Sequence, residues 1–246
     1  MLQKVIAIAF IGCIVVACSK KLDLNPSTDL GTYFYPITKG KFVIYDVSKI
    51  KYSFSSKNDT QIYQLKEVVG DTFTDLEGNI GYALLRYKRY YTNKSNLSGL
   101  KDSSWTVDSV WNFRSDNFNT VVFESNTPYI KLSYPIELGK SWNGNALNTK
   151  KIQNFKISKK GIKINFGDIV VDNVIEVTQS ADSNALERNI VKEKYGQDIG
   201  LVFIEKRIFD DACKYNFENK PCVPGAKIAS GIIYSQKIIA HGFEKP

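Results

Sequence analysis

The chain has 246 residues, a formal net charge of +8, 43% hydrophobic residues and 24% charged residues. This length and balance are typical of a globular protein with a full hydrophobic core, and they exclude an intrinsically disordered chain. The single histidine, His241, excludes a multi-histidine metal site and a two-histidine acid–base pair.

The N-terminus has the pattern of a bacterial lipoprotein signal. A short basic start precedes an apolar run over residues 5–16, which is too short to span a membrane but fits the apolar core of a secretory signal. The run ends in VVAC at residues 15–18, which resembles a lipobox, where the cysteine thiol receives a diacylglycerol before cleavage. An ordinary secretory signal with an incidental cysteine is the alternative. We therefore expect a signal peptide over residues 1–17, which removes Cys13, and lipidation at Cys18.

The residues after Cys18 indicate a location. Ser19, rather than an aspartate, follows the cysteine, and the enterobacterial sorting rule then predicts an outer-membrane lipoprotein. Lys20 and Lys21 stand where many surface-displayed lipoproteins of Bacteroidetes-like bacteria carry an acidic run, so the periplasmic face is favoured over the cell surface. Palmitate and the other acyl chains would anchor the protein, because each buried CH₂ contributes about 0.8 kcal/mol. Residues 18–32 are then the lipidated N-terminus and a flexible tether.

Two cysteines remain after these assignments, Cys213 and Cys222, with eight residues between them. In an oxidising compartment this pair favours a disulfide. The spacing lacks the C-x-x-C pattern of a redox-active pair. No histidine precedes His241 to complete a metal site. The sequence therefore predicts a Cys213–Cys222 disulfide and no metal site.

The pattern from residue 33 onward is almost entirely that of β-strands. Apolar and polar residues alternate in short segments, separated by turn signals such as Glu77–Gly78–Asn79. This predicts a single all-β domain over residues 33–246, with about a dozen antiparallel strands. Only short stretches such as 183–187 have helical character. The predicted strands cover residues 41–47, 49–54, 61–68, 82–91, 105–107 with 110–113, 120–123, 129–133, 152–157, 162–166, 170–178, 188–194, 201–208 and 228–239.

One segment of the chain recurs. The sequence YPITKGKF at residues 35–42 is echoed by YPIELGKSW at residues 134–142. In both copies proline ends an extended segment, glycine permits a positive φ, and an aromatic residue begins the next strand. A duplicated β-unit and two similar turns in one sheet both account for the repeat.

These turns resemble those of a loose set of Bacteroidetes-type outer-membrane lipoproteins, most of them uncharacterised. VDNVIEV at residues 171–177 and KYGQDIGLV at residues 194–202 are similar to two further segments of that set, so the resemblance covers roughly residues 33–209. It implies a strongly curved antiparallel sheet or open half-barrel, like the periplasmic lipoprotein carriers. The extra residue before Trp142 and the Cys213–Cys222 loop depart from the pattern. The resemblance implies a fold and a location, and no activity.

Candidate catalytic residues are few. His241 lies five residues from the C-terminus, and no Gly-x-Ser-x-Gly motif exposes a serine nucleophile. The oxygen-rich segment 71–79 could bind calcium, but it lacks the twelve-residue spacing of a calcium loop. Asp168, Asp172 and Glu176 are evenly spaced, so on a regular strand they would share a face. Paired carboxylates suit a glycan hydrolase, whereas a charged outer face is the favoured interpretation.

The aromatic content suggests a binding role. Aromatic residues make up 13% of the chain, and a concave aromatic face could hold an acyl chain or another apolar ligand. The scattered basic residues suit anionic headgroups or cell-wall polymers rather than nucleic acid. We therefore expect a non-enzymatic lipid-anchored envelope lipoprotein without a cofactor, which binds a lipid or other apolar ligand. A structural subunit of an envelope complex is the alternative, and a carboxylate-dependent glycan hydrolase is the third hypothesis.

Overall fold

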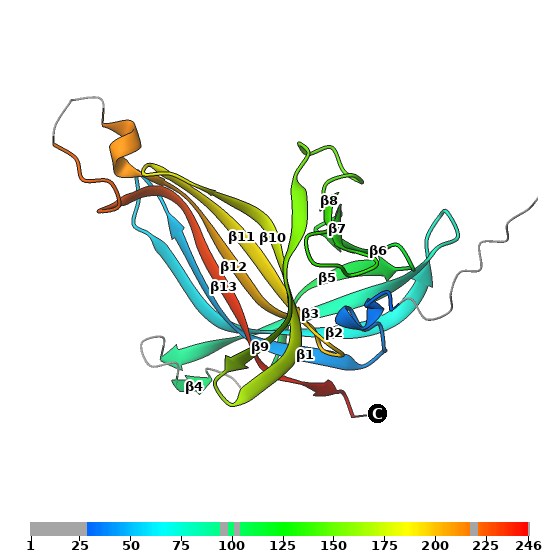
Figure 1. Ribbon diagram of the computed structural model, residues 1–246. Helices are drawn as coiled ribbons and strands as arrows, with labels where there is room; N and C mark the ends of the chain where they lie inside the picture. The colour runs from blue at the N-terminus through cyan, green and yellow to red at the C-terminus, as the bar shows by residue number, and fades with distance from the viewer. Residues whose placement is uncertain (1–28, 94–97, 101–103, 217–220, 246) are drawn as a thin grey trace, which may run out of the picture.

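The computed structural model describes residues 29–93, 98–100, 104–216 and 221–245. Cys13 and Cys18 lie outside the described residues. The described residues form one antiparallel sheet with two short 3-10 helices, η1 (Thr32–Phe34) and η2 (Ala212–Tyr215), shown in Figure 1. The predicted all-β antiparallel fold is thus confirmed. Neither helical segment in these ranges has the length and hydropathy that a membrane-crossing helix requires.

Thirteen strands are present in the described part of the chain. They are β1 (Lys41–Tyr52), β2 (Asp59–Thr74), β3 (Ile80–Asn93), β4 (Ser98–Leu100), β5 (Thr106–Ser115), β6 (Asn119–Glu124), β7 (Thr127–Ser133), β8 (Ser141–Asn143), β9 (Asn154–Phe166), β10 (Ile169–Ser183), β11 (Glu187–Gly196), β12 (Gly200–Asp211) and β13 (Ile228–Phe243).

The observed strands differ from the predicted ones in several respects. The predicted strand 41–47 and most of 49–54 form one continuous strand, β1, which ends at Tyr52, and most of 152–157 and all of 162–166 belong to β9, which begins at Asn154. The predicted helical stretch 183–187 is a tight turn, in which the backbone N–H of Glu187 donates to the side chain of Asn184 at 2.8 Å. The short strands β4 and β8 were not predicted, because three residues are too few to show alternation.

The strand order makes the sheet a meander that returns to its start. The order is β7-β6-β5-β3-β2-β1-β13-β12-β11-β10-β9-β8, with β4 added beside β3. Since β1 pairs with β13 from Lys41 to Tyr52, the ring of described strands is interrupted only between β7 and β8. The N–H of Ile130 donates to Gly144 O at 3.0 Å, and the indole N–H of Trp142 donates to Ile130 O at 2.8 Å. These bonds close the β7–β8 seam, so the sheet is a nearly closed barrel rather than an open half-barrel.

The two YPI segments occupy equivalent places in this barrel. One leads into β1, which begins the first half of the meander, and the other leads into β8, which begins the second half. Gly40 (φ 79°) donates its N–H to Val69 O on β2, and Gly139 (φ 87°) donates its N–H to Ile157 O on β9, both at 2.8 Å. The same turn thus bonds to the second strand of each half, which favours a duplicated β-unit.

The hydrophobic core lies inside the barrel and includes some of the first described residues. Phe34 of η1 is fully buried in a cluster with side chains of β7, β9, β10 and β11. Next to it, the ring of Tyr35 packs on Phe113 of β5 at 5.2 Å between centroids. Ile136 donates its N–H to Leu30 O at 3.0 Å. The folded part therefore begins earlier than residue 33, which was the predicted start of the domain.

The disulfide expected from the sequence is present in the structure, and joins Cys213 to Cys222 with their Cα atoms 5.7 Å apart. It lies at the η2 end of the molecule, at the upper left of Figure 1. There the ring of Phe54, from the β1–β2 turn, packs on Tyr215 at 5.8 Å between centroids. The two sulfurs are bonded to each other, so neither is a free thiol or a metal ligand.

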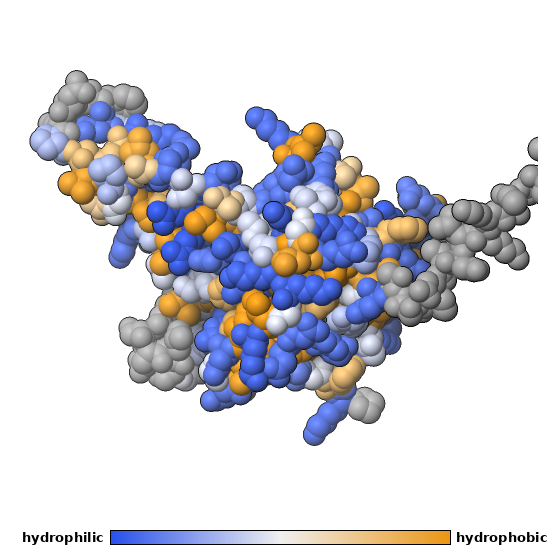
Figure 2. Space-filling model, viewed as in Figure 1, coloured by the Kyte–Doolittle hydropathy of each residue, from blue (hydrophilic) through white to orange (hydrophobic). Residues whose placement is uncertain are grey.

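The surface offers little large apolar area on the face shown in Figure 2, where hydrophilic residues predominate and hydrophobic ones lie among them. The most exposed large hydrophobic side chains include Phe54, Leu76 and Phe118, which belong to the turns of three different hairpins.

Candidate functional site

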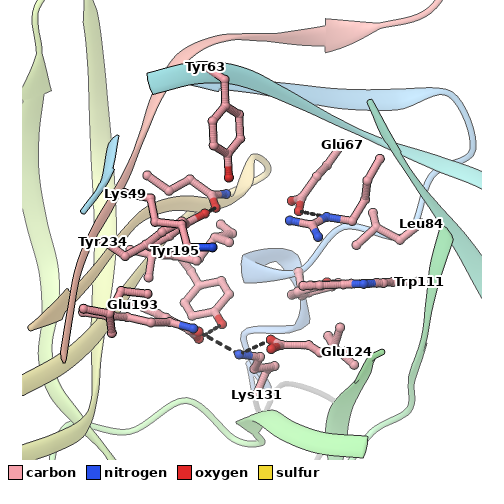
Figure 3. Close-up of a pocket in the computed structure, with 18 residues that line it drawn as sticks. Lys49, Tyr63, Glu67, Leu84, Trp111, Glu124, Lys131, Glu193, Tyr195 and Tyr234 are labelled. Atoms are coloured by element: carbon pink, nitrogen blue, oxygen red, sulfur yellow. Dashed lines mark hydrogen bonds and ion pairs between the residues drawn. The ribbon is translucent and has the colours of Figure 1, made fainter. Parts of the chain in front are cut away.

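The barrel interior contains a cavity of about 270 Å³, shown in Figure 3. Inward-facing residues of both halves of the meander line it, together with Tyr35 after η1. Its volume is near the lower limit for small-molecule sites, which are typically about 300–1,000 Å³. The aromatic lining consists of Tyr35, Tyr63, Trp111, Tyr195 and Tyr234, and the ionisable lining also includes Lys49, Glu67, Arg86, Glu124, Lys131, Glu193 and Lys206. The concave face is thus aromatic, as expected, but it is charged rather than purely apolar.

An ion-paired triad lies at one wall of the cavity. The ammonium of Lys131 on β7 lies 2.6 Å from Glu124 Oε1 and 2.7 Å from Glu193 Oε1. The hydroxyl of Tyr195 donates to Glu193 Oε2 at 2.5 Å. Burial alone would lower the pKa of Lys131, but the two carboxylates outweigh it and raise that pKa above its ordinary value. Burial would likewise raise the pKa of Glu124, but Lys131 holds it below its ordinary value. Lys131 and Glu124 are therefore charged at neutral pH.

A second ion pair lies across the cavity from this triad. Arg86 on β3 donates its Nε–H to Glu67 Oε1 on β2 at 2.9 Å. The same guanidinium lies over the indole of Trp111, 3.6 Å from the ring centroid, which is a favourable cation–π arrangement. Burial would lower the pKa of Arg86, but Glu67 outweighs it and raises that pKa.

The wall formed by β1, β13 and β12 carries cations without such partners. Lys49, Tyr234 and Lys206 lie side by side in register across these three strands. Among the described residues, neither lysine has a carboxylate within 4 Å. The ammonium of Lys206 lies 5.9 Å from the centroid of the Tyr234 ring, and its charge helps to lower the pKa of Glu124.

Gln236 occupies the next inward position of β13 and has an unused donor. Its side chain is only 1% exposed, and its Oε1 accepts from the hydroxyl of Tyr234 at 2.6 Å. Its Nε2 has no hydrogen-bond partner within the described part of the chain. A buried polar group without a partner costs about 1–3 kcal/mol. The fold therefore holds an amide donor at the cavity wall at a cost in stability.

Further hollows adjoin the cavity. One of about 60 Å³ shares Tyr35, Glu67 and two leucines with it, and one of about 350 Å³ shares Glu124, Lys131 and Lys206. The larger hollow is also lined by Gln179, which is 8% exposed and whose Nε2 likewise lacks a partner among the described atoms. The interior space thus continues toward the β8–β9 connection.

The three carboxylates considered for a glycan hydrolase do not form a site. Asp168 and Asp172 are exposed, and Asp172 pairs with Lys163 at 2.9 Å, whereas Glu176 is 3% exposed. The even spacing does not place them on one face, because β10 has an irregular register around Asn173, whose φ is 52°. None of the three carboxylates lines the cavity.

The other sequence candidates have structural roles. The carboxylate of Asp75 accepts the N–H groups of Glu77 and Asn79 at 2.9 and 2.8 Å, which orders the β2–β3 turn. It also lies 3.5 Å from Arg114. His241 pairs with Val43 between β13 and β1, and it does not line the cavity. Burial and the charge of Lys41 lower the pKa of His241.

The cavity residues themselves were not found from the sequence. No sequence signal marked Lys131, because the alternation of β7 places it on the opposite face from Ile130 and Leu132. A signal was available for Glu193, which lies between the buried residues Val191 and Tyr195 at alternate positions of β11. Charged residues at core positions of strands indicate buried ion pairs, although the partners come from distant parts of the chain.

Comparison with protein-family models finds no match, and comparison with curated proteins finds none either. Among solved structures, one that matches is the crystal structure of a candidate lipoprotein from Parabacteroides distasonis. It is 14% identical to this chain, covers 85% of this chain and 98% of its own, and has a TM-score of 0.33. A TM-score of this size does not establish a common fold.

Proposed function

We propose that this protein is a lipid-anchored envelope lipoprotein whose barrel binds a small molecule without converting it chemically. The observation that carries the ligand-binding part is Gln236, whose side chain lines the cavity and whose buried amide donor has no partner among the described residues. A ligand that supplies an acceptor would remove this cost in free energy. The cavity, in which aromatic side chains surround a few polar groups, suits such a ligand.

The ionisation of the cavity carboxylates argues against acid–base catalysis. A general acid at neutral pH needs a carboxyl whose pKa is raised toward 7. The pKa of Glu124 is lowered instead, and Glu193 is held by Lys131 and Tyr195. Glu124 is thus held in its charged form and the carboxylate of Glu193 in one position, which supports binding over hydrolysis.

The ligand-binding part can be tested by native mass spectrometry. The protein to use is the mature chain, residues 18–246 with Cys18→Ser, purified without detergent, because it contains every described residue. We expect a fraction with additional mass that is released on denaturation. The variant Gln236→Leu, which fills the site with an apolar side chain, should lose this fraction while remaining folded. A chain without bound small molecule that co-purifies with another envelope protein would contradict the proposal and support the structural-subunit alternative.

The lipid anchor is inferred from the VVAC sequence alone and needs its own test. In cells that express the full chain and are fed an alkyne-labelled palmitate, we expect the wild-type protein to be labelled and Cys18→Ser to lose the label entirely. Cys13→Ser is the matched control and should keep it, because residue 13 lies within the apolar run of the signal. Labelling of Cys18→Ser would contradict the anchor. Membrane fractionation and protease treatment of whole cells would then test the outer-membrane location and the periplasmic orientation.

A further inference from the structure

We infer that the cavity takes a small amphipathic anion, whose carboxylate or phosphate group is bound by Lys49, Lys206 and Gln236. This inference rests on the proposed ligand-binding function and names the chemical class of the ligand. Its basis is that the cavity carboxylates are paired with cations, whereas these two lysines and the amide donor of Gln236 are not paired with a carboxylate or another acceptor among the described residues.

The three carboxylates of the cavity are already paired with cations. Glu67 accepts from Arg86 at 2.9 Å, and Glu124 and Glu193 share the ammonium of Lys131 at 2.6 and 2.7 Å. A cationic or strongly donating ligand would therefore have to compete with buried ion pairs that are in good geometry. Such pairs are costly to break, since each carboxylate would lose its partner inside the barrel.

The unused groups are donors and cations. Lys49 and Lys206 flank Tyr234 on adjacent strands, and strands lie about 4.8 Å apart. Their flexible four-carbon stems then allow both ammonium groups to reach one anion. Gln236 lies two residues after Tyr234 on the same face of β13, where its unpartnered Nε2 provides a third donor. Hydrogen bonds to an ionised group are roughly twice as strong as neutral ones, so an anion gains most from this arrangement.

The charge balance of the cavity lining also favours an anionic ligand. Lys49, Arg86, Lys131 and Lys206 outnumber the three carboxylates of the lining. Since the Arg86 pair and the Lys131 triad account for all three carboxylates, the excess positive charge lies on the β1–β13–β12 wall. An anion bound there would neutralise this excess positive charge.

The remaining lining suits an apolar body. The aliphatic side chains of Leu84, Val122, Ile204 and Ile232 and the ring of Trp111 complete the walls. A cavity of about 270 Å³ holds a short chain or a single ring system rather than a long acyl chain. The ligand is thus a small molecule with an anionic head and an apolar body.

Titration calorimetry with four eight-carbon probes tests the inference on the mature chain with Cys18→Ser. The probes are octanoate, octyl phosphate, neutral octanol and cationic octylamine. We expect octanoate or octyl phosphate to bind at least about tenfold more tightly than octanol, and octylamine to bind weakest. The tighter of the two anions distinguishes a carboxylate from a phosphate head.

Variants assign the effect to the proposed groups. Lys49→Met and Lys206→Met should each weaken binding of the anion by about tenfold and leave octanol affinity unchanged. Lys237→Met is the matched control, because this exposed lysine follows Gln236 on β13 and does not line the cavity. Its affinities should equal those of the wild-type chain, and thermal melts should show that all three variants are folded.

The possible outcomes separate the inference from the proposed function. If octanol or octylamine binds as tightly as the anions, or if both cavity lysines can be replaced without loss, the anion inference is wrong and the cavity still binds a ligand. If the probes fail but a co-purified molecule is found, the charge of that molecule decides the inference. If no probe binds and no molecule co-purifies, both proposals are wrong.

Discussion

Replacing Lys131 with methionine is expected to lower the free energy of unfolding at pH 7 by about 3–5 kcal/mol. The reason is that the carboxylate of Glu193, which is 1% exposed, would lose its cation inside the barrel. Glu124 would lose the same partner, although its side chain is 24% exposed and can be hydrated. Urea unfolding followed by tryptophan fluorescence measures the loss.

The loss should shrink as the pH falls. In the wild-type chain the pKa of Glu124 is depressed, so its contribution to stability is present above the ordinary glutamate pKa of about 4.3 and disappears only at lower pH. In Lys131→Met the cation that depresses the pKa of Glu124 is absent, so this contribution is missing at every pH. The difference in free energy of unfolding between the wild-type chain and the variant should therefore be largest above the ordinary glutamate pKa and shrink below it.

Two further variants make this prediction specific. Lys163→Met removes an ion pair with Asp172 whose two side chains are 69% and 72% exposed, and it should cost less than about 1 kcal/mol. The double variant Lys131→Met with Glu193→Gln removes the buried charge as well and should recover about half of the loss. If Lys131→Met costs no more than Lys163→Met, the triad does not stabilise the barrel.

The fold class was predictable because each strand carries its own local signal. In β1 the alternation places Val43, Tyr45 and Val47 in the core, and the turn at Gly40 precedes it with a glycine at positive φ. The closure of the barrel was not predictable in the same way. It depends on the pairing of β1 with β13, in which Lys41 lies opposite Phe243, and no local pattern encodes a partner so distant in the sequence.

The same limit explains why the candidate site was missed. Lys131 and Glu193 are 62 residues apart, and they meet only because the barrel brings β7 and β11 to one cavity. The even spacing of Asp172 and Glu176 was misleading, because it predicted that the two side chains share one face of a strand. A single residue at positive φ, Asn173, interrupts the period of two, and the two carboxylates then face different surroundings.

The β7–β8 seam gives the second large prediction, which concerns Gly144. A Cβ at this position would lie 2.4 Å from the ring of Phe155, which is 2% exposed and belongs to the core. Gly144 also donates its N–H to Gln153 O at 2.9 Å and accepts the N–H of Ile130, so the backbone cannot move away without breaking the seam. We expect Gly144→Ala to lower the free energy of unfolding by about 2–3 kcal/mol because the core would be overpacked.

A double variant and a control distinguish this clash from a general cost of replacing glycine. Phe155→Leu makes room for the added methyl group. The double variant, Gly144→Ala with Phe155→Leu, should therefore lose less free energy of unfolding than the sum of the losses in the two single variants, by at least about 1 kcal/mol. Gly242→Ala, whose Cβ would lie 3.3 Å from the Phe42 ring, should cost less than about 1 kcal/mol. Additive losses would mean that Gly144 and Phe155 do not close the seam together. Since Phe155 also lines the hollow next to the cavity, a coupled result would link closure of the barrel to the shape of its interior.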